Sequence, residues 1–518
     1  MKYRKLLCLL LALSASTSFA ATQLTTSPNN LVLQKQPSFF RFSFDEVSMP
    51  QNIQPMGLLG INYFADITPN IYAGVGGYGA VTGSQGGLFV LGIEGGLHHE
   101  FFPHWWGDAG VFAGGGGGRS SLVGGGLMLR PHAGIAYQWS WARLGIHYSY
   151  VKFPSGFIHS SQVGLDFDIP WDFYYVSASD INSGVFTLPD IKLPLDKFLF
   201  LRRNDFGLLV QAYKQKPGTK NNAGMVQDGT IGLVGAELDH YITDNGFWYV
   251  KAAGAFSGIP NGYMDVLGGL GYHWGLGSHG FALVPQFGIG AGGGGMVETG
   301  GGVLIQPQLG VEWPLSSHFA TRFSGGYLWS PKGNLSAVTG TAQLLYHLDI
   351  ATAANQPGGY LPEKFDIQGW RISIFNQKYF HPQRTFTTST SAINMIALQF
   401  DQLFTPNFFI SYQAAAAYSG LHAGGYATGM IGPGLQTSPF FSKHLQLFTE
   451  VLAGAGGGGS LALGGGALIE PVVGLNYAFT PGISLQTSVA ELKALRNNLN
   501  TPLFNLGISF EFGMLERA

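Results

Sequence analysis

One glycine-rich pattern occurs three times in this chain of 518 residues and limits the folds that are open to it. Each copy is a run of four or five glycines, a short break, three more glycines and, five residues after the last of them, a proline. The prolines are Pro131, Pro307 and Pro471, which lie 176 and 164 residues apart. A period of this length indicates repeated domains or barrel segments rather than solenoid coils. We therefore expect an internal triplication with units over residues 39–170, 200–350 and 367–512.

The segments between the units have the composition of connections. "TLPDIKLPLDK" (Thr187–Lys197) and "ATAANQPGGYLPEK" (Ala351–Lys364) are rich in proline and in turn-forming residues. We expect linkers over residues 171–199 and 351–366. Inside the units, the stretches "ITPNIY", "ITDNGFWY" and "FTPNFF" each predict a tight turn between two apolar runs.

The first 20 residues read as a secretory signal peptide. Lys2, Arg4 and Lys5 precede an apolar run, and Ser18-Phe19-Ala20 ends it in the small-x-small pattern of a cleavage site. The only cysteine, Cys8, lies within this leader, so the exported chain does not depend on disulfides. Removing the leader changes the formal net charge from −2 to −5, and no basic patch follows. Nucleic acid is therefore a poor candidate partner.

Composition and periodicity indicate strands that face lipid. Charged residues make up 11% of the chain, against about 25% in typical soluble domains. After the leader there is no apolar run of about 18 residues, the length of a membrane helix. Within residues 304–314, Leu309, Val311 and Trp313 share one face, and Gln306 and Glu312 share the other. The other two units keep this phase over about ten residues, which is the length of a tilted membrane strand.

Each unit carries eight strand-like runs, so the strands can close into barrels in two ways. Three eight-stranded antiparallel barrels in tandem form the first, and one wide barrel of about 24 strands is the alternative. Eight strands leave a lumen that side chains fill, whereas 16 or more enclose water. The inward positions are mostly Gly, Ala, Ser and Gln rather than charged, and the first linker is long. Both features favour three small transmembrane β-barrels.

The unit ends carry a further pattern. "NLGISFEF" (Asn505–Phe512) has aromatics at its last and third-last positions, and "QVGLDFDI" (Gln162–Ile169) and "TAQLLYHL" (Thr341–Leu348) are similar. The pattern resembles the C-terminal strand signature of bacterial outer-membrane β-barrel proteins. The resemblance implies localisation in the bacterial outer membrane. It also implies two partners, the barrel assembly machinery and outer-membrane lipid or lipopolysaccharide. The extracellular ligand stays unknown.

The glycine runs do not read as a nucleotide site. A phosphate-binding loop needs Gly-Lys-Ser/Thr at the start of a helix, and here Arg119, Met296 and Ser460 stand at the corresponding places. The runs instead predict the tip of the hairpin between the fifth and sixth strands, where glycine lets backbones approach. The histidines of "HHEFFPHWW" (His98–Trp106) lack ligand spacing. We expect neither a cofactor nor a metal.

One catalytic candidate remains, in "RLGIHYSYVKFPSG" (Arg143–Gly156). The run resembles the lipid A deacylase family, eight-stranded outer-membrane hydrolases marked by a His-Tyr-Ser-Asn sequence. The resemblance implies that His147 is a general base and Ser149 a nucleophile. Tyr150 stands where the family has asparagine, and strand parity points His147 and Ser149 inward.

We therefore expect an integral outer-membrane β-barrel protein with a structural or surface-interaction role and no enzymatic activity. Two alternatives stay open. One is a pore formed by a single wide barrel, and the other is a lipid A-modifying hydrolase that uses the first unit.

Overall fold

The computed structural model describes residues 31–518 apart from 119, 182, 195–196, 259–261, 278–279, 355–360, 386–388, 390 and 443. These residues form mainly antiparallel sheets, with one short α-helix, α2 (Ser120–Val123). The expected leader over residues 1–20, with Cys8, lies outside the described residues. Over the described part of the chain, no helix is long and apolar enough to cross a membrane.

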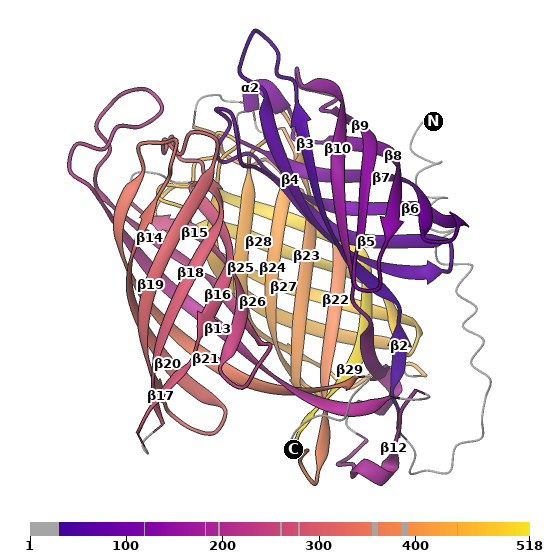
Figure 1. Ribbon diagram of the computed structural model, residues 1–518. Coiled ribbons are helices and arrows are strands. Elements are labelled where there is room, and N and C mark those ends of the chain that lie inside the picture. Colours follow the sequence, from indigo (N-terminus) through magenta and orange to yellow (C-terminus); the bar gives the residue numbers. More distant parts are fainter. Residues whose placement is uncertain are drawn as a thin grey trace.

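Barrel one closes on itself with eight strands (Figure 1). They are β3 (Ser38–Val47), β4 (Met56–Thr68), β5 (Ile71–Ala80), β6 (Phe89–Phe102), β7 (Trp105–Gly117), β8 (Met128–Gln138), β9 (Arg143–Lys152) and β10 (His159–Pro170). Consecutive strands pair, and the last strand, β10, pairs back with the first from Gly164↔Asp45 to Pro170↔Phe39.

Barrel two repeats this layout. Its strands are β13 (Phe198–Gln215), β14 (Thr230–Tyr241), β15 (Gly246–Ser257), β16 (Met264–Tyr272), β18 (Phe281–Gly293), β19 (Val303–Pro314), β20 (Phe319–Trp329) and β21 (Ser336–Ala354), with a short β17 (Trp274–Leu276) beside β18. The ring closes where β13 pairs with β21 over its whole length, from Phe198↔Ala354 to Gln215↔Ala337.

Barrel three is the last ring. Its strands are β22 (Phe365–Tyr379), β23 (Ile393–Thr405), β24 (Phe408–Ser419), β25 (Ala427–Gln436), β26 (Leu445–Gly457), β27 (Ala467–Thr480), β28 (Ile483–Ala494) and β29 (Asn500–Arg517). Strand β22 pairs with β29 from Phe365↔Arg517 to Tyr379↔Leu503 and closes the ring.

The pairings decide between the two closures. Barrels two and three share only a short bridge, Ile350↔Glu516 and Ala351↔Leu515, which makes their hydrogen-bonded sheets continuous. Each ring nevertheless closes through its own first and last strands. The prediction of three eight-stranded barrels is confirmed, and the alternative of one barrel of about 24 strands is wrong for the described residues. The physical reason is the register: within each unit, the first and last strands pair with each other, although they lie far apart in the sequence.

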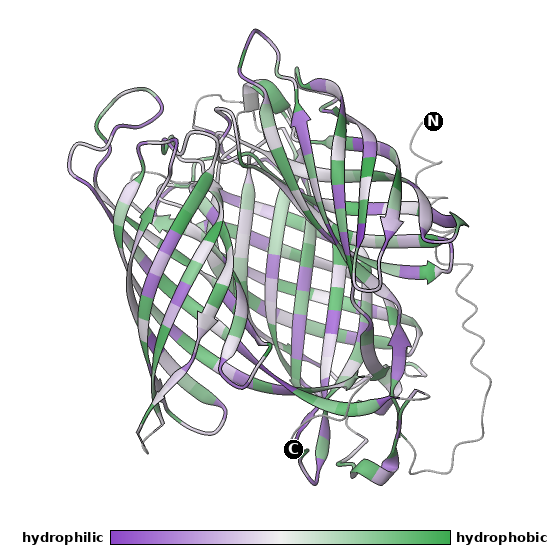
Figure 2. Cartoon of the chain, in the orientation of Figure 1, coloured by the Kyte–Doolittle hydropathy of each residue, from purple (hydrophilic) through white to green (hydrophobic). Residues whose placement is uncertain are grey.

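The walls alternate as the parity predicts. In β19, the outward Leu309 and Trp313 are 50% and 56% exposed, whereas the inward Gln306 and Glu312 are buried. Figure 2 shows the same alternation of hydrophobic and hydrophilic residues along the strands of all three walls. The outward face of the walls is therefore apolar and continuous, as it is in a barrel that faces lipid.

The segment expected as a linker over residues 171–199 lies between barrels one and two and contains short strands. Strand β11 (Phe173–Ser177) pairs with β2 (Gln34–Gln36) and touches β29. Strand β12 (Ile191–Lys192) pairs in parallel with β1 (Leu31–Val32). Four barrel strands, β13, β21, β22 and β29, run past the rings at this end. Together the segments bury an apolar cluster that includes Leu31, Tyr174, Val176, Ile191, Phe365 and Leu515.

Candidate functional site

The last glycine of each repeated run has a backbone conformation that suits glycine. Gly126, Gly302 and Gly466 have φ angles of 95°, 104° and 97°. L-residues rarely adopt such angles, because Cβ then clashes with the backbone. All three glycines lie in the loop between the fifth and sixth strands of their barrel, as the hairpin-tip interpretation predicts.

The same three glycines meet the wall of a neighbouring barrel. A Cβ on Gly126 would lie 2.2 Å from the carbonyl oxygen of Ala417 in barrel three. A Cβ on Gly466 would lie 2.3 Å from that of Ala255 in barrel two. A Cβ on Gly302 would lie 2.3 Å from the carbonyl oxygen of Ala80 in barrel one, which completes the cycle. Each tip therefore touches the third strand of the next barrel, and three equivalent contacts close on themselves.

Backbone hydrogen bonds join the tips to loops of the neighbouring barrels. Gly424 N donates to Gly124 O at 2.9 Å, between barrels three and one. Gly86 N donates to Gly300 O at 3.0 Å, between barrels one and two. Since bulky side chains would separate these backbones, small residues are required on both sides of each contact. The glycine runs thus form the junction of the three barrels.

The walls below the tips also approach closely through small residues. A Cβ on Gly254 in β15 would lie 3.3 Å from the Cβ of Ala455 in β26. A Cβ on Gly79 in β5 would lie 3.7 Å from the Cβ of Ala291 in β18. Small residues let membrane-embedded surfaces approach and gain dispersion contacts without a hydrophobic driving force.

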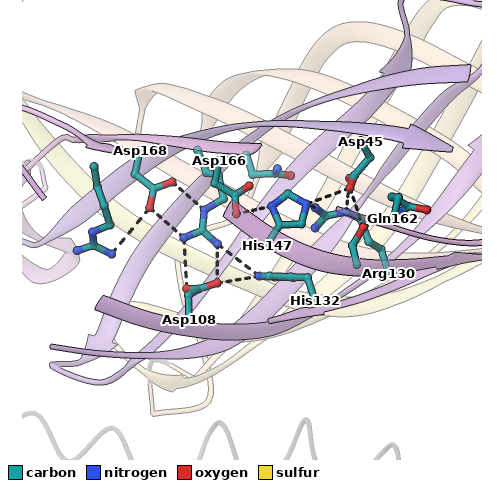
Figure 3. Close-up of polar contacts among 12 residues, drawn as sticks. Asp45, Asp108, Arg130, His132, His147, Gln162, Asp166 and Asp168 are labelled. Carbon is teal, nitrogen blue, oxygen red and sulfur yellow. Dashed lines mark hydrogen bonds and ion pairs between the residues drawn. The ribbon is translucent and has the colours of Figure 1, made fainter. Parts of the chain in front are cut away.

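The catalytic candidates His147 and Ser149 are both buried on the inward face of β9, and Figure 3 shows His147 among polar side chains in the lumen of barrel one. Ser149 Oγ donates to Asp45 Oδ1 at 2.6 Å and accepts from Gln162 Nε2 at 2.7 Å. His147 Nε2 lies 2.9 Å from the same Asp45 oxygen. No hydrogen bond joins the Ser149 hydroxyl to the His147 imidazole among these described side chains. Ser149 is 0% exposed, so a substrate in the lipid phase does not reach its hydroxyl in this state.

An acid does orient His147. Asp166 Oδ2 lies 2.7 Å from His147 Nδ1, which fixes the ring while Nε2 faces Asp45 and Arg130. Arg130 Nε donates to Asp45 Oδ2 at 2.7 Å. The base that the resemblance implies is therefore held within an ion-pair network, with its second nitrogen already engaged.

A second network fills the lumen toward the end where the chain enters barrel one. Arg41 donates two hydrogen bonds to Asp168, at 2.8 and 2.9 Å, and two to Asp108, at 3.0 and 3.2 Å. His132 Nε2 lies 2.8 Å from Asp108. Bidentate arginine–carboxylate pairs are the strong, geometrically specific ones.

Barrels two and three each hold a buried, ion-paired arginine in the lumen. In barrel two, Arg322 contacts Glu237, Asp239 and Glu312 at 2.9 to 3.1 Å. In barrel three, Arg371 Nε donates to Asp401 at 2.7 Å. The expectation that inward positions carry few charges therefore needs correction, because the buried charges are concentrated at a few levels of each lumen.

The opposite half of each lumen, beneath the glycine tips, is sealed by apolar side chains. Barrel one holds Met56, Leu58, Tyr78 and Phe112 there, all buried. Similar clusters occupy barrels two and three. Charged networks and apolar clusters together leave each eight-stranded lumen filled.

Sequence reasoning missed the charged residues of these networks, although a signal was present. Arg41 and Asp45 lie four residues apart on one face of β3, and Asp166 and Asp168 lie two apart on one face of β10. Buried charges are paired, so opposite charges on the inward phase of adjacent strands would have pointed to the network. Which strands pair, and which charged residues therefore meet, is known only from the register of the folded sheet.

Comparison with known proteins yields no family model that matches this chain and no matching curated relative. Among solved structures, the siderophore receptor PirA from Acinetobacter baumannii has a TM-score of 0.28 and 10% identity, over 92% of this chain and 80% of that one. OccK3 (OpdO) of Pseudomonas aeruginosa has a TM-score of 0.22 and 10% identity, over 93% and 96%. A mutant of the ferric enterobactin receptor PfeA from Pseudomonas aeruginosa has a TM-score of 0.27 and 8% identity, over 93% and 81%. At these scores the likeness carries no argument about function.

Proposed function

We propose that this chain is an integral protein of the bacterial outer membrane with a structural or surface-interaction role, built as three closed barrels without a conducting lumen and without enzymatic activity. The observation that carries the proposal is the contrast between the two faces of the walls. Outward residues such as Val163 and Phe323, at 68% and 60%, are apolar and exposed. Inward residues such as Arg322 are fully buried and ion-paired.

Sidedness follows from the chain path. Each ring begins and ends at the same edge, so its short turns, such as residues 69–70 and 406–407, lie at that edge. Outer-membrane barrels have short periplasmic turns and longer external loops. The glycine tips and the loop over residues 216–229 therefore lie on the external side of the membrane. The cluster around Tyr174 and Val176 lies on the periplasmic side.

Cysteine labelling tests this proposal directly, because the only native cysteine, Cys8, lies in the expected leader. Met225→Cys is placed in an external loop and Asp244→Cys in a short turn, and both positions are exposed. A membrane-impermeant maleimide should label Met225→Cys on intact cells, and Asp244→Cys only after permeabilisation. Equal labelling of both positions on intact cells would contradict the orientation. Extraction of the wild type by carbonate would contradict membrane integration.

Planar-bilayer conductance tests the closed lumens. The reconstituted wild type should show no stable open channel, because each lumen is filled by paired charges and an apolar cluster. The matched variant Glu237→Ala/Glu312→Ala/Arg322→Ala removes three of the side chains that fill barrel two, and its folding is checked by heat-modifiable migration. A uniform open step of the wild type would contradict the proposal that the three lumens are closed.

The hydrolase remains a second candidate because of one observation, the Asp166 carboxylate on His147 Nδ1. An acid, a histidine and a serine on one inward face are the components of an acyl-transfer site. The hydroxyl of Ser149 must leave Asp45 for such chemistry. Mass spectrometry of lipid A from a host lacking its own deacylase tests this, with Ser149→Ala as the control. We expect the same acylation with either protein.

A further inference from the structure

The wall of barrel two carries a shallow groove of about 500 Å³ at its external end. The groove is lined by Tyr327 and Trp329, on the outward face of β20, and by Asn334 and Ser336. The rings of Tyr327 and Trp329 lie 6.1 Å apart, and the Tyr327 hydroxyl is hydrogen-bonded to Ser336. The groove thus presents aromatic faces and polar groups at the level where the apolar wall ends.

Four lysines surround this groove. Lys332 precedes Gly333 of its lining, and Lys214 is the register partner of Val338 in β21. Lys216 N donates to Ser336 O at 2.8 Å, and Asn334 Nδ2 donates to Lys220 O at 3.5 Å, so the loop that carries both lysines adjoins the groove. All four lysines are exposed.

None of the four ammonium groups forms an ion pair or a side-chain hydrogen bond among the described residues. Two carboxylates of the same region accept backbone hydrogen bonds and keep their negative charge. Asp228 accepts from Gly218 N at 2.7 Å, and Glu298 accepts from Gly300 N at 2.8 Å. Four unpaired ammonium groups against two carboxylates leave the patch with a net positive charge at the membrane boundary, where it attracts anionic headgroups.

The surface toward the membrane is apolar and continuous with the groove. Phe323 and Val338 point outward from β20 and β21, and each is 60% exposed. An acyl chain packed along them would place its headgroup at Tyr327 and Trp329, because aromatic side chains with a polar tip favour this interface.

We infer that this groove is a binding site for a phosphorylated, acylated glycolipid of the outer leaflet. The phosphates would contact Lys214, Lys216, Lys220 and Lys332, the sugar would lie against the aromatic pair, and the acyl chains would follow the wall of barrel two. The inference rests on the proposed function, since it requires barrel two to face lipid. We assign the ligand as a lipid rather than free phosphate, because the cationic cluster and the apolar wall meet in one groove.

Lipid retention by the full chain tests the inference. The protein is reconstituted in phosphatidylcholine vesicles with or without bis-phosphorylated lipid A, released in mild detergent and examined by native mass spectrometry. The wild type should retain lipid A. The variant Lys216→Gln/Lys220→Gln/Lys332→Gln should lower the retained fraction at least about tenfold, because each lysine near a membrane adds to the attraction. Trp329→Ala should also lower retention.

The matched control removes three lysines from the external ends of the other barrels, as Lys152→Gln/Lys378→Gln/Lys493→Gln. It should retain lipid A like the wild type, and an equal loss would overturn the assignment to barrel two. Dephosphorylated lipid A should not be retained, and excess inorganic phosphate should not displace the bound lipid; complete displacement would overturn the lipid assignment. Heat-modifiable migration confirms that each variant is folded. If the wild type resists carbonate extraction but retains no lipid A, only this inference is contradicted. If carbonate extracts the wild type from the membrane, the proposed function is contradicted.

Discussion

At the scale of single residues, the lumens hold charges that only their partners make tolerable. Arg322 is 0% exposed and contacts three carboxylates. Desolvation of each ion costs several kcal/mol, and the mutual attraction offsets this cost only when the geometry is good. Such clusters specify how the strands of a small ring fit together, and their loss leaves unpaired buried charge.

The first prediction concerns this arginine. Arg322→Met should lower the free energy of unfolding by about 3–5 kcal/mol, because Glu237, Asp239 and Glu312 lose their buried cation. Urea unfolding in detergent micelles, followed by tryptophan fluorescence, measures the change. Arg517→Met is the control, since its contact with Asp349 is 3.8 Å long and more than half exposed, and surface pairs contribute about 0–1 kcal/mol. Equal effects of the two substitutions would contradict the role of the buried cluster.

The second prediction concerns the junction glycines. Gly126→Ala should destabilise the protein by about 1–3 kcal/mol, because alanine at a φ of 95° is strained. Its Cβ would also displace the Ala417 carbonyl. Gly429→Ala is the control, since a Cβ there meets nothing within 4 Å. The temperature at which heat-modifiable migration is lost measures both variants, and equal values for Gly126→Ala and the wild type would argue against the junction.

The third prediction concerns Ser149 as a structural residue. Ser149→Ala removes one of the buried hydrogen bonds of Asp45 and the bond that Gln162 Nε2 donates, which should cost about 1–3 kcal/mol of stability. Ser161→Ala is the control, because Ser161 is exposed on the outward face of β10. Urea midpoints measure both substitutions. A Ser149→Ala protein as stable as the wild type would indicate that the hydroxyl is not needed for packing.

At the scale of elements, strand length decides where the barrels join. Strands β13, β21 and β29 have 18, 19 and 18 residues, whereas about 9–11 residues cross a membrane. Their extra residues project beyond the rings at the edge where each ring begins and ends, and they pack with β1, β11 and β12. The connection between barrels one and two is thereby held in place rather than free.

The fourth prediction tests this packing. Val176→Asp places a carboxylate at a position that is 0% exposed and that contacts Gly513 of β29. Burying an unpaired charge is costly, so β11 should detach and the segment over residues 171–199 should become sensitive to protease in permeabilised cells. Val185→Asp is the control, because Val185 is 57% exposed. The idea fails if both variants resist digestion as the wild type does.

At the scale of the whole molecule, three similar units form a closed cycle within one chain. Barrel one contacts barrel three, barrel three contacts barrel two, and barrel two contacts barrel one, each through the same pair of elements. A heterologous contact that closes after three copies generates a ring. Here the copies are covalently joined, so ring formation does not depend on protein concentration.

The fifth prediction follows from this cycle. The wild type should lose its heat-modifiable form in one cooperative step, because every barrel contacts both of the others. Gly302→Ala opens one of the three contacts and should lower the midpoint or split the transition. Differential scanning calorimetry of the protein in detergent measures this, with Gly340→Ala, an open position, as the control. Three well-separated transitions in the wild type would show that the barrels unfold independently.

The sequence by itself determined the triplication, the strand count and the faces of the strands. These features are local, since strand period, turn residues and repeats are properties of neighbouring residues. Strand pairing across long separations is not local, so ring closure, the buried partners of Arg41, Arg322 and Arg371, and the fold of the segment over residues 171–199 emerged only in the tertiary structure. The same holds for the glycine runs. Their spacing predicted a hairpin tip, but only the structure placed Gly126, Gly302 and Gly466 against the carbonyls of neighbouring barrels, because a contact between units depends on how closed rings meet in space.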